Sequence, residues 1–460
     1  MRTVRRLSAV LLLSSFAFNT AIADDMLIPS LTLDDYTQKA IDEGVQGKEN
    51  ALTFESAGYS RQIAFRQTDS PTLSAGYTHT RSESKGDGID TLTDNHESTL
   101  TLNQPTILGT NVMATGTYGD ANRPGFNATA TQPLYIFVWN PALRARRQAE
   151  LSFGVAKDTF DSTILSLRTQ ARTFYYNVMQ GNEAIQVAER KLQSSQKLLD
   201  VTQALVDAGK LAPVERMRAK IVVQTDTRQL ENTTVSRDQA LLQAKNFIYW
   251  PFDEPVHFTT RLQFRPFSVS LDRLVEYAML HNPELRTLQR NQELARLTTQ
   301  TAMETTRPTF SLNSGYSYVQ ADPLTVTHGW TLGGTANWLF FDSFVTRDKV
   351  RQARIAEAVA DLNRADSERT IRVNVESAYL DVKRTEKQIV DFQSSREQAH
   401  HDVEVVRLRF QNGLERLIDV FDAENSMRDL DNEYLGLVVQ FNQSKDKLTQ
   451  LVGTDVERLR

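Results

Sequence analysis

The stretch FQNGLERLIDVFDAENSM, residues 410–427, interrupts a sequence that is otherwise typical of one long α-helix. Gly413 stands at the interruption, and glycine readily adopts the positive φ with which many helices end. Helical periodicity resumes after it, and Asp419 and Asp422 lie three residues apart, so both carboxylates point to one face of the new helix. The segment therefore predicts a tight hairpin of two helices with a pair of acids just beyond the turn.

The same pattern occurs earlier in the chain. A shift of 204 positions superposes Gly209 on Gly413, Tyr175 on Tyr379 and Ile185 on Ile389. In each copy, a proline-free helical stretch precedes the turn and a helix of about 35 residues follows it, with another such helix beginning at Leu33 and at Leu271. The two proline-free stretches are residues 143–208 and 347–411, each about 100 Å long at about 1.5 Å per residue. The chain is therefore predicted to be a tandem duplication in which two shorter helices stack end to end along each long one.

Each copy also contains alternating segments typical of β-strands. They are residues 70–80 with 125–137 in the first copy, and residues 307–319 with 329–341 in the second. One face of these segments is apolar and aromatic, and the other carries small hydroxyl, amide and glycine residues, which suits a water-filled lumen. A soluble β-sandwich would also alternate. The aromatic residues that we expect at a membrane interface are Tyr77, Tyr135, Tyr316, Tyr318, Trp330 and Trp338.

Residues 81–125 have no counterpart in the second copy. They contain two further candidate strands, at about 99–104 and 111–118, which either join the sheet or form an external loop. Four or six strands leave open edges, and an open edge in lipid leaves backbone groups unsatisfied at a cost of several kcal/mol each. Closed membrane barrels have at least about 8 strands, so several chains must contribute to one barrel.

The first residues predict export. Arg2, Arg5 and Arg6 precede an apolar run and the small residues of AIA, which is the pattern of a signal peptide cleaved between Ala23 and Asp24. An uncleaved anchor is the alternative, but the run is shorter than the roughly 20 residues of a spanning helix. Removing the three arginines takes the formal net charge from −5 to −8, which argues against a nucleic-acid partner.

No motif for chemistry is evident. The chain has no Cys, which excludes disulfides, thiolate metal sites and a lipid-anchored cysteine. His400 and His401 are adjacent on a helix and point about 100° apart, unlike the i, i+4 pair of a helical metal site. We therefore expect no metal site, no cofactor and no catalytic residues.

The chain resembles the TolC family of outer-membrane efflux and secretion channels over its whole mature length. The resemblance rests on TQPLY and NWLFFDS at the ends of the strand pairs, on RRQAE and VRQAR at the start of the long helices, and above all on RFQNGLERLIDVFDAE, residues 409–424. It implies an α+β membrane protein that is a homotrimer. Four strands per chain would close a 12-stranded barrel in the outer membrane, in contact with its lipid, continued by an α-helical barrel across the periplasm.

The resemblance also implies a role without enzymatic activity. The channel would be the exit duct for an inner-membrane pump of the resistance-nodulation-division or ABC type, coupled through a periplasmic adaptor protein. The hairpin tips, which would contact the adaptor, are Gly209, Lys210, Leu211, Gly413, Leu414 and Glu415. An exported coiled-coil scaffold or adaptor without channel activity is the alternative function.

Asp419 and Asp422 match the positions at which this family places acidic rings at the periplasmic gate. Six carboxylates from three chains would attract cations and raise one another's pKa. By themselves, the two acids would also suit a solvated helix start, where carboxylates are favourable. Phe410 and Arg416 are the candidate gate-closing contacts.

The predicted organisation along the chain follows from these features. Its parts are a signal peptide at 1–23, a first repeat at 24–250, an equatorial linker at 251–270, a second repeat at 271–453 and a tail at 454–460.

Overall fold

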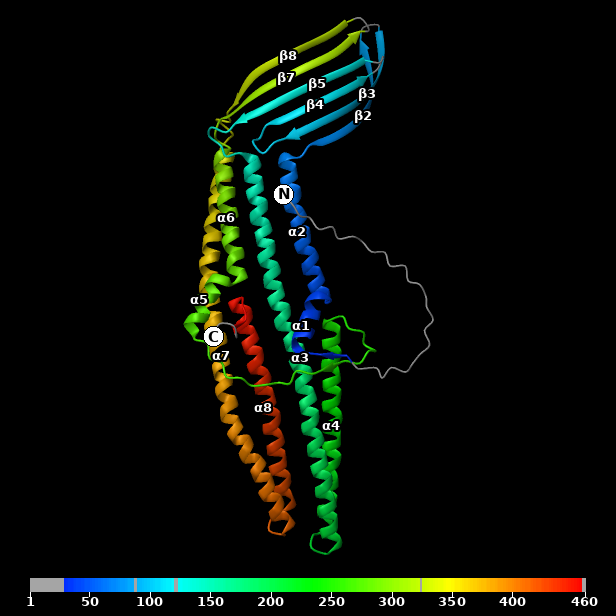
Figure 1. The fold of residues 1–460 in the computed structure, drawn as a ribbon, viewed down its shortest axis with the longest axis vertical. Helices are drawn as coiled ribbons and strands as arrows, with labels where there is room; N and C mark the ends of the chain where they lie inside the picture. Colours follow the sequence, from blue (N-terminus) through cyan, green and yellow to red (C-terminus); the bar gives the residue numbers. More distant parts are fainter. Residues whose placement is uncertain (1–28, 87–88, 120–122, 323–324, 457–460) are drawn as a thin grey trace, which may run out of the picture.

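The computed structural model describes residues 29–86, 89–119, 123–322 and 325–456. The predicted signal peptide and its cleavage site, Ala23 and Asp24, lie outside these residues. The molecule is elongated, with a β-sheet at one end and long helices that run away from it (Figure 1). Within the described ranges, none of the helices combines the length and the apolar character needed to cross a membrane.

The two longest helices are α3 (Pro141–Asp207) and α7 (Val345–Gln411), each of 67 residues. Along α3 lie α2 (Val45–Asp69) near the sheet and α4 (Pro213–Phe247) farther from it. Along α7, α6 (Pro283–Glu304) and α8 (Leu417–Val452) take the corresponding places. This arrangement confirms the predicted duplication and the end-to-end stacking of the shorter helices.

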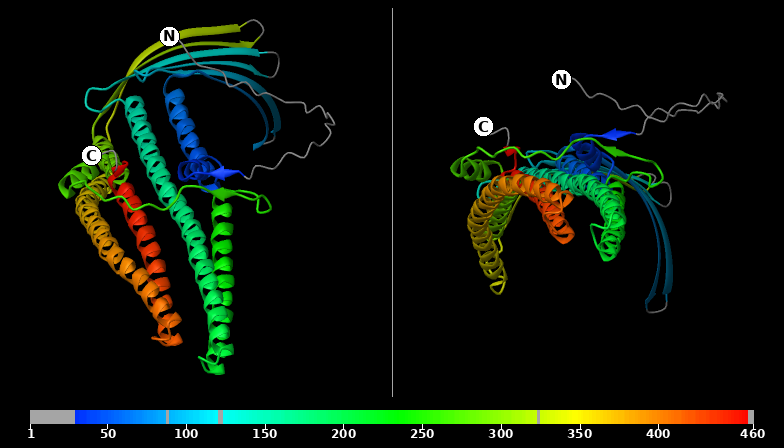
Figure 2. Two further views of the ribbon diagram at one scale, coloured as in Figure 1. Left: turned by 60° about the horizontal axis from the view of Figure 1, so that its bottom comes forward. Right: turned by 90° about the horizontal axis from the view of Figure 1, so that it is seen from below.

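Four helices lie abreast at each level of the molecule. Near the sheet the order is α2, α3, α6 and α7, and toward the far tips it is α4, α3, α8 and α7. The central contacts in both orders are made by α3 with a helix of the other half. Seen from below, the four helices form a curved layer (Figure 2).

The predicted helices that begin at Leu33 and Leu271 are each divided in two. In the first half, α1 (Leu33–Asp42) ends before Gly44, where an added Cβ would lie 2.3 Å from the carbonyl oxygen of Ala40. In the second half, α5 (Leu271–His281) ends before Pro283, which has no N–H to donate and so begins a new helix. The single helices of about 35 residues were therefore wrong at these two places.

The sheet contains six antiparallel strands, which is the larger of the two strand numbers that the sequence left open. Residues 81–125 supply strands of the sheet and do not form an external loop. Residues 72–80 pair with residues 95–103 of this region, and not with residues 125–137 as predicted. A second hairpin follows, formed by β4 (Asn111–Gly119) and β5 (Arg123–Leu134), and β5 pairs with β7 (Thr309–Asp322) of the second half of the chain. In spatial order the strands are β2 (Thr72–Gly86), β3 (Ile89–Pro105), β4 (Asn111–Gly119), β5 (Arg123–Leu134), β7 (Thr309–Asp322) and β8 (Thr325–Asn337).

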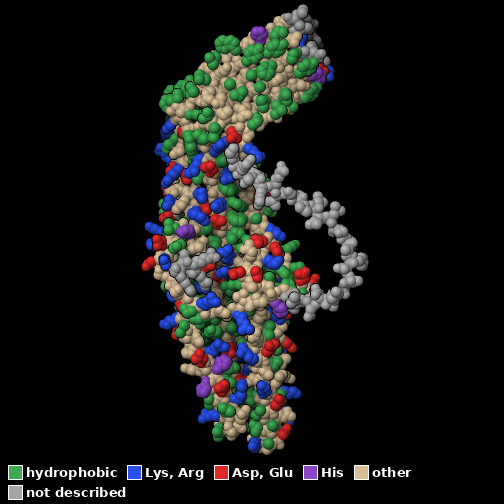
Figure 3. Space-filling model, viewed as in Figure 1, with side chains coloured by type: hydrophobic (Ala, Val, Ile, Leu, Met, Phe, Trp, Pro, Cys, Tyr) green, Lys and Arg blue, Asp and Glu red, His purple; other side chains and the backbone are tan. Residues whose placement is uncertain are grey.

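The register keeps the apolar and polar residues apart across all six strands. Directly opposed residues share a face, and one apolar row runs through Leu73, Leu102, Ala114, Ala128, Tyr316 and Trp330. The neighbouring row on the other face is Ser74, Thr101, Thr115, Asn127, Ser317 and Gly329. Figure 3 shows hydrophobic side chains over the sheet and charged side chains over the helices.

The linker between the halves crosses the middle of the helical layer (Figure 1). A short parallel pair of strands, β1 (Ser30–Leu31) and β6 (His257–Phe258), joins the start of the described chain to this linker. Tyr36 and Tyr175 lie buried beneath them, and the Tyr36 hydroxyl donates to the carbonyl of Ala244 at 2.8 Å. The middle of the layer thus contains a buried core of the first half.

Candidate functional site

The two hairpin tips have the same backbone geometry. Gly209 has φ of 70° and Gly413 has φ of 73°, as the helix-end pattern predicted. In the first tip the N–H of Lys210 donates to the carbonyl of Leu205, and in the second Leu414 donates to Arg409, both at 2.9 Å. These are the long hydrogen bonds of a Schellman motif, which closes a helix at a left-handed residue. The internal repeat therefore extends to individual backbone hydrogen bonds.

The side chains at the tips are largely available to a partner. Leu414 is 74% exposed and Lys210 is exposed, whereas Leu211 is partly buried against the apolar cluster beneath the turns. Glu415 lies near Arg409, with Oε2 to Nη1 at 3.5 Å.

Asp419 is held by a neighbour in its own helix. The guanidinium of Arg416 donates to both carboxylate oxygens, at 2.8 and 2.9 Å, and the Arg416 backbone N–H donates to Oδ2 at 3.2 Å. The hydrogen bond from Arg416 holds the pKa of the Asp419 carboxyl below its ordinary value. The raised pKa that we expected concerns six carboxylates from three chains and stays a prediction. Arg416 thus contacts the proposed gate acid itself.

Asp422 is exposed on the same helix. Its repeat-related position is Arg218, which donates to Glu215 at 2.8 Å, and Glu215 in turn corresponds to Asp419. Each tip therefore contains one carboxylate paired with an arginine three residues away. The remaining difference is a positive charge at position 218 against a negative charge at position 422.

Phe410 does not project from the tip. It is only 1% exposed and packs in a cluster with Leu198, Ala219, Leu417 and Val420. These residues come from all four helices, so the cluster packs the four helices together just above the turns. Phe410 is a packing residue in this arrangement.

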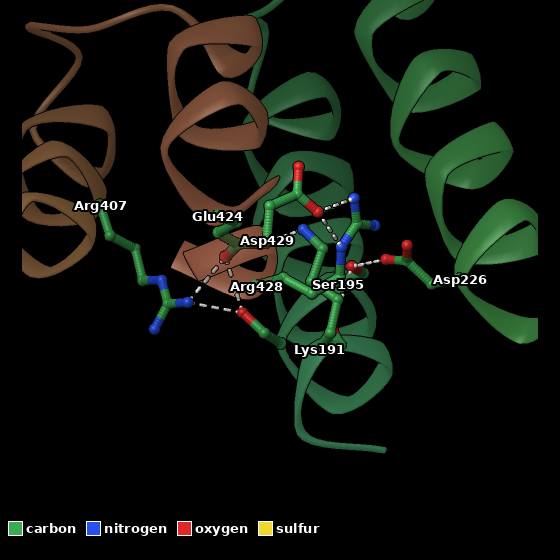
Figure 4. A network of polar contacts seen from close by, with 8 residues as sticks. Lys191, Ser195, Asp226, Arg407, Glu424, Arg428 and Asp429 are labelled. Atoms are coloured by element: carbon green, nitrogen blue, oxygen red, sulfur yellow. Dashed lines mark hydrogen bonds and ion pairs between the residues drawn. The ribbon is translucent and has the colours of Figure 1, made fainter. Parts of the chain in front are cut away.

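Above this cluster a polar network crosses the four helices (Figure 4). On α8, Glu424 is fully buried and accepts from Lys191 of α3 at 2.7 Å and from Arg407 of α7 at 2.6 Å. On the other side of α3, the Ser195 hydroxyl donates to Asp226 of α4. The hydroxyl of Ser194 also donates to Glu424, at 2.7 Å. The network ties the two hairpins together.

Burial by itself would raise the pKa of Glu424. Lys191, Ser194 and Arg407 outweigh this effect and hold the pKa of the carboxyl below its ordinary value. The acid is therefore ionised near neutral pH, and the buried charge is paired on two sides. A cleft of about 580 Å³ between α3, α7 and α8 adjoins this network.

Our sequence interpretation overlooked Glu424, although a signal was present. Leu417, Val420 and Phe421 mark the apolar stripe of α8, and Glu424 is the next residue on that stripe. An acid on an apolar stripe requires a buried cationic partner. That partner, Lys191, lies 233 residues away in sequence, and no local pattern identifies it.

The proposed interface aromatics occupy two zones. Tyr77, Tyr316, Tyr318 and Trp330 lie within strands, whereas Tyr135 and Trp338 follow the ends of β5 and β8 next to the helices. The segments that follow β5 and β8 also carry exposed apolar residues, namely Ile136, Phe137, Leu339, Phe340, Phe341 and Phe344. Exposed apolar patches of this kind are typical of surfaces that contact a membrane or a protein.

Comparison with known proteins accounts for this architecture. The family model of the outer membrane efflux protein matches residues 48–246 and 274–454. No curated protein sequence matches the chain. The chain therefore belongs to the outer membrane efflux protein family, as the sequence resemblance predicted.

Solved structures share the fold. The CmeC outer membrane channel of Campylobacter jejuni is 13% identical with a TM-score of 0.71, over 92% of this chain and 85% of CmeC. The outer membrane protein VceC of Vibrio cholerae is 15% identical with a TM-score of 0.70, over 92% of this chain and 96% of VceC. The open-state MtrE channel of Neisseria gonorrhoeae is 16% identical with a TM-score of 0.70, over 92% of this chain and 89% of MtrE.

Proposed function

We propose that three copies of this chain form one channel through the outer membrane, which is the exit duct of a tripartite efflux or type I secretion system. The observation that supports this most is an open six-stranded sheet, apolar on one face, that continues into a curved layer of four helices. The edge strands β2 and β8 each need a partner in lipid. Other copies of the chain can supply both partners.

With six strands from each of three chains, the barrel would have 18 strands. At a spacing of about 4.8 Å and a tilt of about 45°, 18 strands span a circumference of about 120 Å. Twelve helices at about 8–10 Å apart span about 100–120 Å. The 18-stranded barrel and the ring of twelve helices therefore have similar circumferences, and the barrel can join the helices without narrowing.

The far tips are the surface that we assign to the periplasmic adaptor, and through it to an inner-membrane pump. The identical turns at Gly209 and Gly413 would present six similar hairpins in a trimer. Exposed Leu414 and Lys210 would provide apolar and charged contacts.

The gate in this proposal depends more on Asp422 than on Asp419. Arg416 already compensates the charge of Asp419, whereas Asp422 is exposed. Three copies of Asp422 around a narrow lumen would bind polyvalent cations, because like charges that converge in a pore concentrate counter-ions.

The test is single-channel conductance of the detergent-purified trimer in a planar bilayer, with and without a trivalent cation. Block should weaken severalfold in Asp422→Asn and less in Asp419→Asn, because Asp419 is already paired. Glu215→Gln, at the first tip, is the matched control and should leave block unchanged. Equal block in all variants would reject the gate. A protein that washes off membranes at alkaline pH would reject the channel and support the coiled-coil scaffold instead.

A further inference from the structure

Two strands bring three metal-ligating side chains together midway along the β2–β3 hairpin, where it extends beyond the end of β4. His79 lies on β2, and Asp94 and His96 lie on β3. The antiparallel register places His79 directly opposite His96, and their rings lie 4.3 Å apart between centroids. One ligand atom from each of the three residues lies within 4.8 Å of the other two.

We propose that His79, Asp94 and His96 bind one divalent transition-metal ion, with Zn²⁺ as the reference ligand. Two imidazoles and one carboxylate form a ligand set that zinc commonly takes in proteins, with the fourth position left to water. Imidazole nitrogen also suits copper and nickel, whereas calcium and magnesium require oxygen ligands.

The distances suit such an ion. Two ligands about 2.0–2.1 Å from a tetrahedral zinc lie about 3.3 Å from each other. Here Nδ1 of His79 lies 3.0 Å from Nδ1 of His96, and Nε2 of His79 lies 3.2 Å from Oδ1 of Asp94. The two distances use different nitrogens of His79, and one ion uses one of them, so binding requires a rotation of side chains.

A neighbouring aromatic orients the cluster. The Tyr77 hydroxyl lies 2.6 Å from Nδ1 of His96, and its ring stacks on the His96 ring at 6.1 Å between centroids. An ion at this nitrogen would displace the hydroxyl, which remains close enough to bond to a metal-bound water. Groups in this outer position commonly tune metal affinity.

The face on which the cluster lies identifies the source of the ion. Leu73, Tyr77 and His79 alternate along β2 and share the apolar face of the sheet, not the face of small hydroxyl residues. β4 ends at Gly119, opposite Glu97, so Asp94 and His96 lie beyond the last residue pair of β3 with β4. The ion would therefore come from the medium around the rim and would not be cargo on the polar face. Because it would bind side chains of both strands, the ion would cross-link the edge strand β2 to β3.

This site was not foreseen, because we searched for metal ligands at helical spacing. His79 and His96 are 17 residues apart, and only the strand register makes them neighbours. The proposal does not depend on channel activity, so a failure of the conductance experiment would leave it standing.

The test is isothermal titration of Zn²⁺ into the full-length protein, purified in detergent without a polyhistidine tag and treated with a chelator. We expect saturable binding of one ion per chain. His96→Gln should weaken binding by at least the about 10–100-fold that loss of an outer-shell partner causes. His328→Asn, on the other edge strand, is the matched control and should bind as the wild type does.

A second measurement guards against a variant that does not assemble. Co²⁺ added to the wild-type protein should give the strong visible absorption of a four-coordinate ion, and Zn²⁺ should displace it. Absence of saturable Zn²⁺ binding by the wild type would overturn the proposal. Unchanged binding by a folded His79→Asn, His96→Gln double variant would overturn it equally.

Discussion

At the first hairpin tip, Gly209 ends α3 and Glu215 pairs with Arg218; at the second, Gly413 ends α7 and Asp419 pairs with Arg416. The turns are closed by the same hydrogen bonds. Besides the opposite charges at positions 218 and 422, the two tips differ farther along the helices, where Glu424 is fully buried and its repeat-related residue, Lys220, is exposed.

This difference follows from the place of each helix in the layer. Glu424 lies on α8, which packs against α3 of the other half, and its partner Lys191 is buried. Lys220 lies on α4, at one edge of the layer, and the repeat-related partner position, Ser395 on α7, is exposed at the other edge. The duplicated backbone thus has one seam between its halves inside the chain, where α3 packs against α8, and in the proposed trimer the outer edges of the layer would form a second seam with neighbouring copies.

The largest expected effect tests the seam inside the chain. Glu424→Ala should lower the free energy of unfolding by about 3–5 kcal/mol, because it leaves the Lys191 charge buried without its main partner. Lys220→Ala, the repeat-related control, should change it by less than about 0.5 kcal/mol. Urea unfolding followed by circular dichroism measures both. A double variant, Lys191→Met with Glu424→Leu, should recover much of the loss, and equal effects at 424 and 220 would contradict the comparison.

A smaller effect tests the equivalence of the turns. Gly209→Ala and Gly413→Ala should each cost about 1–2 kcal/mol, the cost of a left-handed backbone for a residue with a Cβ. No atom lies within 4 Å of a Cβ added at either position, so conformation alone sets the cost. Thermal unfolding of the two variants measures it, with Asn at the same positions as the milder control. A large difference between the turns would mean that one of them is held by contacts outside the chain.

The smallest effect is the pH dependence of the seam. The pKa of Glu424 is lower in the folded chain than its ordinary value. Its contribution to stability is therefore complete above the unfolded pKa of about 4.3 and is lost as the pH falls through the folded value. Unfolding midpoints measured from pH 7 to pH 3 should fall less steeply in Glu424→Gln than in the wild type. Glu231→Gln, at an exposed position of α4, should follow the wild-type slope.

Much of the helical part could be predicted from the sequence. The proline-free stretches before Gly209 and Gly413 predicted both long helices to within two residues at each end. The breaks at Gly44 and Pro283 were overlooked, although glycine and proline are signals for such breaks.

The sheet was harder to predict. Residues 81–125 have no internal copy. The candidate strand at 111–118 matches β4, whereas the one at 99–104 covers only the last part of β3, and neither was given its partner. Pairing of β2 with β3 rather than with residues 125–137 is a choice of register between distant segments, which alternation alone does not specify.

The sequence by itself determined the features that depend on neighbouring residues, namely the helix periods, the two glycine turns with positive φ, the strand alternation and the duplication. Each of these follows from backbone sterics or from side chains within one or two turns of each other. Only the tertiary structure decided the features that join distant residues, namely the six-strand order, the burial of Glu424 against Lys191 and the meeting of His79 with His96. They depend on which surfaces bury one another, and a buried charge or a strand register has its energy only once its partner is in place.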